Sequence, residues 1–234
     1  MLRVRGLTGG YGRATVLHGV DLEVPAGGVV ALMGRNGMGK TTLLRTCMGL
    51  LPARQGEIRF KDRDITGAAT HEIARQGLAY VPQGREIFDA LTVEQNLRLG
   101  LIGLRGGRNA DVPDDVYGWF PILAERRRQI AGTLSGGQQQ MLAIGRALAR
   151  RPDMLLLDEP TEGIQPSIVH EIAETVARIA ADAGLTVLVV EQNVDLVLTT
   201  ARTIAFMDNG RVVETAPAAD VAADSAILAR HLSL

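Results

Sequence analysis

The chain has 234 residues, enough to bury a sizeable core as one large domain or as a domain with an added lobe. Its 25 Lys and Arg residues nearly balance 26 Asp and Glu residues, so the charge does not favour a nucleic-acid-binding surface. No apolar run approaches the ~18 residues that span a bilayer, and Met1 to Arg5 does not resemble a signal peptide, so we expect a cytoplasmic protein.

The first part of the chain is predicted to be rich in strands. These strands are Leu2 to Leu7, Val16 to Val24 and Val29 to Met33. Tyr11 lies in the turn after the first of them, within Gly9-Gly10-Tyr11-Gly12. The third is a short apolar run, which is typical of a buried parallel strand.

A glycine-rich loop follows the third strand and precedes a predicted helix that begins at Thr41. Gly34 to Thr41 matches G-x-x-x-x-G-K-[ST], and strand, loop and helix together are the context of a phosphate-binding loop. Lys40 would reach the β- and γ-phosphates of ATP, and the Thr41 hydroxyl would ligate Mg²⁺. The predicted ATP-binding residues of this loop are Gly34, Arg35, Asn36, Gly37, Met38, Gly39, Lys40, Thr41 and Thr42.

The middle of the chain changes from strand to helix patterns. Strands over Gly56 to Phe60 and Leu78 to Val81 come first; Thr92 can then cap a helix, and a Gly-rich loop covers Gly103 to Pro113. We therefore predict one domain, 1–234, with an inserted helical subdomain. Its predicted parts are an α/β core over 1–83 and 152–234 and a helical subdomain over 84–151.

Ser135-Gly136-Gly137 precedes a predicted helix that begins at Gln138. Small residues permit close backbone approach, and a helix N-terminus favours an anion. An ordinary helix cap by Ser135 is the alternative. Farther along, four apolar residues lead to Asp158-Glu159, which places two carboxylates at the end of a buried strand. Asp158 would hold Mg²⁺ and Glu159 would polarise the attacking water.

The end of the chain returns to strand and helix alternation, as expected of an α/β core. Leu185 to Val190 is predicted to be the last buried strand. Ile204 to Met207 and Arg211 to Glu214 are predicted to form a hairpin across Asp208-Asn209-Gly210, and a short helical tail follows.

Together these motifs resemble the ATP-binding subunits of ATP-binding cassette (ABC) transporters, nearly from end to end. The resemblance implies an α/β P-loop NTPase ABC cassette: a mixed sheet core, an N-terminal antiparallel β-subdomain and an inserted α-helical subdomain. Leu134 to Gln138 matches the signature motif of that family. The family sandwiches two ATP molecules between two subunits, which implies that this segment contacts the ATP of the other subunit. The residues of that contact are Ser135, Gly136, Gly137 and Gln138.

The resemblance also assigns roles outside these motifs. Tyr11 stands where the family stacks an aromatic residue on adenine, although a loop aromatic can also pack on the sheet. Gln83 matches a residue that senses Mg²⁺ and the attacking water, so the implied metal set is Thr41, Gln83 and Asp158. Gln192 replaces a His found in most members, and it would contact the γ-phosphate as a neutral donor. The implied catalytic set is Glu159, Lys40 and Gln192.

Gln192 and the Glu162-Gly163 pair resemble the branch that serves importers of branched-chain amino acids and related small polar solutes. The stretches 34–37, 81–88 and 158–168 resemble the urea-type members most. The implied partners are a second ABC ATPase chain or another copy of this one, two membrane permease subunits and an extracytoplasmic solute-binding protein. The chain would then lie on the inner face of the plasma membrane and would bind no nucleic acid.

Soluble ABC-type ATPases of DNA maintenance or translation are the competing class. The former interrupt the ATPase with long coiled coils, for which the segment between Gln83 and Ser135 is too short. The latter carry two cassettes in one chain, whereas this chain has one. Recovery of the protein with DNA or ribosomes would identify either type.

Overall fold

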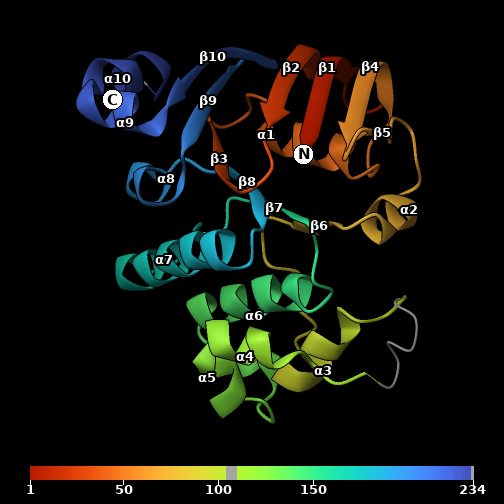
Figure 1. The fold of residues 1–234 in the computed structure, drawn as a ribbon, viewed down its shortest axis with the longest axis vertical. Helices are drawn as coiled ribbons and strands as arrows, with labels where there is room; N and C mark the ends of the chain where they lie inside the picture. The colour runs from red at the N-terminus through yellow and green to blue at the C-terminus, as the bar shows by residue number, and fades with distance from the viewer. Residues whose placement is uncertain (104–109, 233–234) are drawn as a thin grey trace.

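The computed structural model describes residues 1–103 and 110–232, whose strands form two sheets (Figure 1). The smaller sheet is antiparallel, with the order β2-β1-β4-β5, and it confirms the predicted N-terminal β-subdomain. Its strands are β1 (Leu2–Gly9), β2 (Leu17–Val24), β4 (Ala53–Phe60) and β5 (Arg63–Asp64).

The larger sheet has the order β10-β9-β3-β8-β7-β6 and is parallel except for β10. The predicted hairpin is confirmed as β9 and β10, although β10 continues to Pro217. The mixed α/β fold class is therefore confirmed. The strands are β3 (Gly28–Met33), β6 (Leu78–Val81), β7 (Met154–Asp158), β8 (Thr186–Val190), β9 (Thr203–Asp208) and β10 (Arg211–Pro217).

A helical lobe lies at one end of the molecule, at the bottom of Figure 1. It contains α3 (Val93–Leu99), α4 (Asp114–Trp119), α5 (Pro121–Glu125), the 3-10 turn η1 (Ala131–Thr133) and α6 (Gly136–Leu148). Thr92 caps α3 as predicted. Part of the Gly-rich loop predicted over 103–113, residues 104–109, lies outside the described residues. The other helices are α1 (Lys40–Cys47), α2 (Thr70–Arg75), α7 (Pro166–Asp182), α8 (Val194–Thr200), α9 (Ala218–Ala223) and α10 (Ser225–Leu232).

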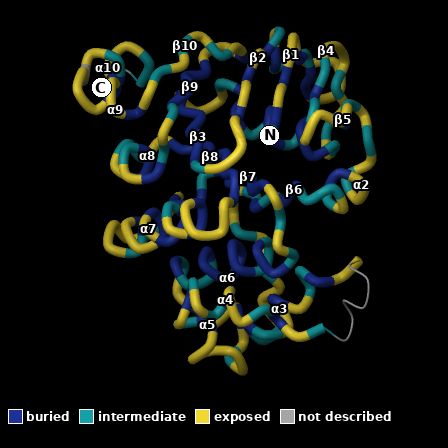
Figure 2. The backbone as a smooth tube through the Cα atoms, in the orientation of Figure 1, coloured by how far each residue is buried: buried dark blue, intermediate teal, exposed yellow. Residues whose placement is uncertain are grey.

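Both faces of the larger sheet are buried, each against different elements (Figure 2). In β3, Val29, Ala31 and Met33 join the cluster formed with α6 and α7. Val30 and Leu32 point to the other face and pack with α1 and the smaller sheet. Because side chains alternate along a strand, burial of both faces requires the continuous apolar runs seen in the sequence.

The polar residues lie where the parallel strands of the larger sheet end. β3 leads into the loop at Gly34, β7 ends at Asp158, and β8 is followed by Glu191. β6 is followed by Pro82 and Gln83. Because parallel neighbours end at the same edge of a sheet, these loops meet there. No helix in the described ranges is long and apolar enough to cross a membrane.

Candidate functional site

The loop between β3 and α1 holds Lys40 inside the protein, with only 4% of the residue exposed. Its ammonium donates hydrogen bonds to the carbonyl oxygens of Gly34 (2.7 Å) and Arg35 (3.0 Å). Burial lowers the pKa of Lys40, and the nearby Glu159 carboxylate opposes that shift. Gly34 is required here, because a Cβ would lie 2.3 Å from the Met207 carbonyl oxygen. The loop therefore surrounds the Lys40 ammonium at the N-terminus of α1. A cation beside a helix N-terminus is an arrangement that favours binding of an anion such as phosphate.

The other predicted residues of this loop differ in their exposure. Arg35, Asn36 and Gly37 are exposed, whereas Gly39 and Thr42 are buried. The Met38 sulfur accepts a hydrogen bond from the backbone of Asn209 in the β9–β10 turn (3.3 Å). That contact joins the loop to the hairpin.

Asp158 is almost fully buried at the end of β7, with 1% exposed. Its Oδ1 accepts a hydrogen bond from the Thr41 hydroxyl and its Oδ2 one from the Tyr80 hydroxyl, both at 2.9 Å. Burial raises the pKa of the Asp158 carboxyl, and these hydrogen bonds oppose the rise. A hydroxyl and a carboxylate that face each other are oxygen ligands of the kind Mg²⁺ prefers, so the donor set fits this ion.

Glu159 has a backbone φ of 46°, an uncommon conformation for a residue that is not glycine. Its Oε1 lies 3.6 Å from the Lys40 ammonium and accepts a hydrogen bond from the Gln192 amide (3.1 Å). Its Oε2 accepts one from the Gln83 amide (3.3 Å). Lys40, Gln83 and Gln192, which come from three separate parts of the sequence, thus surround the Glu159 carboxylate.

Each of the two glutamines also donates to a second residue, a contact that was not predicted. Gln83 donates to Glu162 (2.8 Å), and Gln192 donates to Asn36 of the phosphate-binding loop (2.6 Å). The Gln192 amide therefore links the loop to Glu159.

Glu191 is a buried carboxylate that the sequence analysis missed. Its Oε1 accepts hydrogen bonds from the Thr161 backbone (3.0 Å) and hydroxyl (2.6 Å). Its Oε2 accepts from the backbones of Gln192 (2.9 Å) and Asn193 (3.1 Å). Glu191 thus fixes the Gln192 loop to the segment after β7. The sequence signal that could have identified Glu191 is its position directly after the buried apolar strand β8.

Tyr11 is exposed by 43% in the turn between β1 and β2, which disfavours the alternative that it packs on the sheet. Arg54 of β4 holds this turn. Its guanidinium donates to the carbonyl oxygens of Gly12 (2.7 Å) and Ala14 (3.0 Å) and to the Thr15 hydroxyl (2.8 Å).

Ser135 caps α6, which begins at Gly136 rather than at the predicted Gln138. The Ser135 side chain accepts from the Gln138 backbone (3.4 Å), and the Gln138 side chain accepts from the Ser135 backbone (3.1 Å). Gly137 permits close packing, because a Cβ would lie 2.3 Å from Ile168 of α7. Among the described residues, no hydrogen bond joins 135–138 to the phosphate-binding loop.

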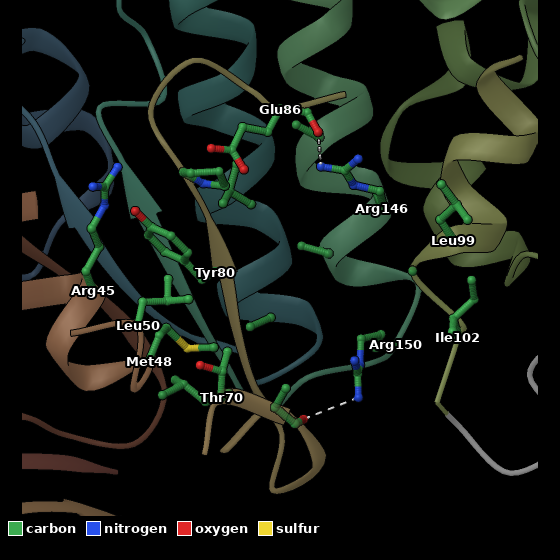
Figure 3. Close-up of a pocket in the computed structure, with 18 of the residues that line it drawn as sticks. Arg45, Met48, Leu50, Thr70, Tyr80, Glu86, Leu99, Ile102, Arg146 and Arg150 are labelled. Carbon is green, nitrogen blue, oxygen red and sulfur yellow. Dashed lines mark hydrogen bonds between the residues drawn. The ribbon is translucent and has the colours of Figure 1, made fainter. Parts of the chain in front are cut away.

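A groove of about 800 Å³ lies between the helical lobe and the core (Figure 3). Exposed apolar side chains line it, among them Leu50, Phe88 and Ile102. Arg146 of α6 donates to the carbonyl oxygen of Glu86 (2.8 Å) and lies over the Phe88 ring. The helical lobe thereby holds the segment that follows Gln83.

The family model described as "ABC transporter" matches residues 17–162. The chain belongs to the ABC transporter family. It is 44% identical over 203 residues to the high-affinity branched-chain amino acid transport ATP-binding protein BraG of Pseudomonas aeruginosa, covering 87% of each chain. It is 36% identical over 212 residues to the probable branched-chain amino acid transport ATP-binding protein LivF of Archaeoglobus fulgidus, covering 91% of this chain and 90% of that one.

A solved structure of a nucleotide-free ATP-binding cassette from an ABC transporter has a similar fold. Its TM-score is 0.86 at 28% identity, and the match covers 97% of each chain. The protein is therefore an ABC-type ATP hydrolase, as predicted. The hydrogen-bonded cluster around Glu159 and Asp158 is its candidate site for ATP hydrolysis.

Proposed function

We propose that this ABC ATPase powers the import of a small polar solute through a membrane complex. One observation carries the proposal: residues 82–88 connect the candidate hydrolysis site to the groove. At one end Gln83 donates to Glu159, and at the other Glu86 and Phe88 line the groove against Arg146. A permease segment in the groove would therefore contact the same loop that contacts the catalytic carboxylate.

In this proposal the chain's own residues bind and orient MgATP. Lys40 exchanges its contacts with loop carbonyl oxygens for the β- and γ-phosphates, and Tyr11 supplies an exposed ring for adenine. Thr41, Asp158 and Gln83 would hold Mg²⁺. The ion supplies charge neutralisation at the phosphates.

Hydrolysis requires a base near the γ-phosphate. Glu159 accepts the proton of the attacking water while the Gln83 and Gln192 amides orient its carboxylate. Gln192 then donates to the γ-phosphate as a neutral group. The positive φ of Glu159 fits a residue whose carboxylate is held in one orientation for proton transfer.

The second half of each ATP site would come from another subunit. Ser135 is exposed and Gly136 partly exposed at the N-terminus of α6, and a helix N-terminus attracts anions. We propose a head-to-tail pair with a homologous chain or with a second copy. Two permease subunits and an extracytoplasmic solute-binding protein would complete the importer, with this chain peripheral on the inner face of the plasma membrane.

The names of the two relatives favour branched-chain amino acids as the solute. Urea stays a separate prediction from the sequence patterns. None of the residues described above would touch the solute. The identity of the solute must therefore be measured on the assembled importer.

The test is ATPase activity of the importer reconstituted in vesicles with its permeases and solute-binding protein. Leucine, isoleucine, valine and urea are added singly to the solute-binding side. Stimulation by one class identifies the solute. Copurification with DNA or ribosomes, without a membrane partner, would instead support a soluble ABC-type ATPase.

A further inference from the structure

Tyr80 of β6 lies between the groove and the buried carboxylate of Asp158. Its ring lines the groove, while its hydroxyl donates a hydrogen bond to Asp158 Oδ2 at 2.9 Å. Figure 3 shows the Tyr80 side chain in the wall of the groove, beside the Arg45 guanidinium. One side chain therefore touches both regions that the proposed function connects.

The two oxygens of Asp158 have different partners. Thr41, the other oxygen ligand proposed for Mg²⁺, donates to Oδ1, whereas Tyr80 donates to Oδ2. A carboxylate this deeply buried needs hydrogen-bond donors to remain charged. Because Tyr80 holds Oδ2, the carboxylate is kept in the rotation that directs Oδ1 toward Thr41.

Arg45 of α1 lies beside Tyr80 at the groove (Figure 3). The nearby Tyr80 is the main reason that the pKa of the Arg45 guanidinium is raised. A phenol can accept one hydrogen bond while donating another, so the Tyr80 oxygen can accept a donor on the groove side while its hydroxyl donates to Asp158.

We propose that Tyr80 is a positioning residue that orients Asp158 for Mg²⁺. The inference rests on the proposed function, because it assumes that Asp158 and Thr41 bind the ion. Tyr80 itself would not touch the ion or the nucleotide. A purely structural role, in which the ring only fills the wall between β6 and the groove, is the competing explanation.

Removal of one hydroxyl separates these explanations. Tyr80→Phe keeps the ring and removes the donor. Tyr117→Phe is a matched control, because the Tyr117 hydroxyl is buried with no hydrogen-bond partner among the described residues. Calorimetry measures ADP binding in EDTA and at a series of Mg²⁺ concentrations, and the Mg²⁺ dependence of ATP hydrolysis is measured in parallel.

We expect Tyr80→Phe to bind ADP like the wild type in EDTA. We also expect it to require about 10-fold more Mg²⁺ for both readouts, the size of one hydrogen bond to a charged group. Its turnover should return toward the wild-type value at saturating Mg²⁺, and Tyr117→Phe should match the wild type throughout.

Two results would overturn the inference: an unchanged Mg²⁺ requirement in Tyr80→Phe, or an equal loss of ADP affinity with and without Mg²⁺, as a packing defect would cause. The wild type is measured first. A wild type that binds no ADP, or gains nothing from Mg²⁺, would contradict the proposed function as well.

Discussion

The phosphate-binding loop and the Ser135–Gln138 segment use the same physical device, a helix N-terminus preceded by small residues, yet their surroundings differ. At the loop, Lys40 and Asp158 are buried, and each is hydrogen-bonded within the chain. At the start of α6, Ser135 is exposed and its side chain bonds only to Gln138. One half of the proposed ATP site is thus organised within the chain, and Ser135, proposed for the other half, faces outward.

This difference teaches what a second subunit would add. A cation held against its own loop can exchange those contacts for phosphate without help from another chain. An exposed helix N-terminus has only the weak anion preference of its dipole until a ligand is brought to it. We therefore expect changes around Glu159 to act on chemistry within one chain, and changes at Ser135 to act on pairing.

Glu159→Gln should have the largest effect. The amide cannot accept the proton of the attacking water, so turnover should fall by about 1,000-fold, as for loss of a general base. ATP binding should persist, and the variant should accumulate as a closed pair. Phosphate release and size-exclusion chromatography with ATP measure these effects. Hydrolysis at the wild-type rate would show that Glu159 is not the base.

Ser135→Asp should separate helix capping from contact with ATP. Aspartate caps a helix as well as serine does, so thermal stability should be unchanged. Its charge would face the γ-phosphate across the interface, where like charges cost several kcal/mol, and turnover should fall by about 100-fold. Binding of ATP to single chains, measured by calorimetry, should be retained. Full activity of this variant would remove Ser135 from the interface.

Gln192→Ala should have a smaller effect on chemistry. It removes one donor to Glu159 and to the γ-phosphate, and the loss of one transition-state hydrogen bond should lower kcat by about 10-fold or more. Gln129→Ala, a change in the helical lobe, is the control and should leave kcat unchanged. Steady-state phosphate release measures both variants, and wild-type turnover in Gln192→Ala would contradict the assigned role.

Much of the fold could be predicted because its signals are local. The apolar run Val29 to Met33, the Asn209-Gly210 turn and the capping residue Thr92 each lie within a few residues of the structure they specify. Element boundaries were less certain, since α6 begins at Gly136 and β10 runs to Pro217. A capping serine can accept a hydrogen bond from the backbone N–H of either the second or the third helical residue. Recognising Ser135 as a cap therefore does not say which residue begins α6.

The contacts of the candidate site could not be predicted from local patterns. Tyr80 meets Asp158, and Glu162 meets Gln83, because separate strands end at one edge of the larger sheet. Sequence alone does not give the strand order that creates these neighbours. Glu191 was missed for the same reason: its partner Thr161 lies after another strand.

The smallest expected effect comes from Ser135→Ala, compared with Thr92→Ala. Both residues cap a helix of the lobe through a reciprocal pair of hydrogen bonds, with Gln138 and Gln95 respectively. Each substitution should therefore lower the free energy of unfolding by about 1 kcal/mol, seen as a shift of a few degrees in Tm. Only Ser135→Ala should also slow ATP hydrolysis, because only Ser135 is proposed to contact ATP. Equal hydrolysis by both variants would leave Ser135 as a helix cap and nothing more.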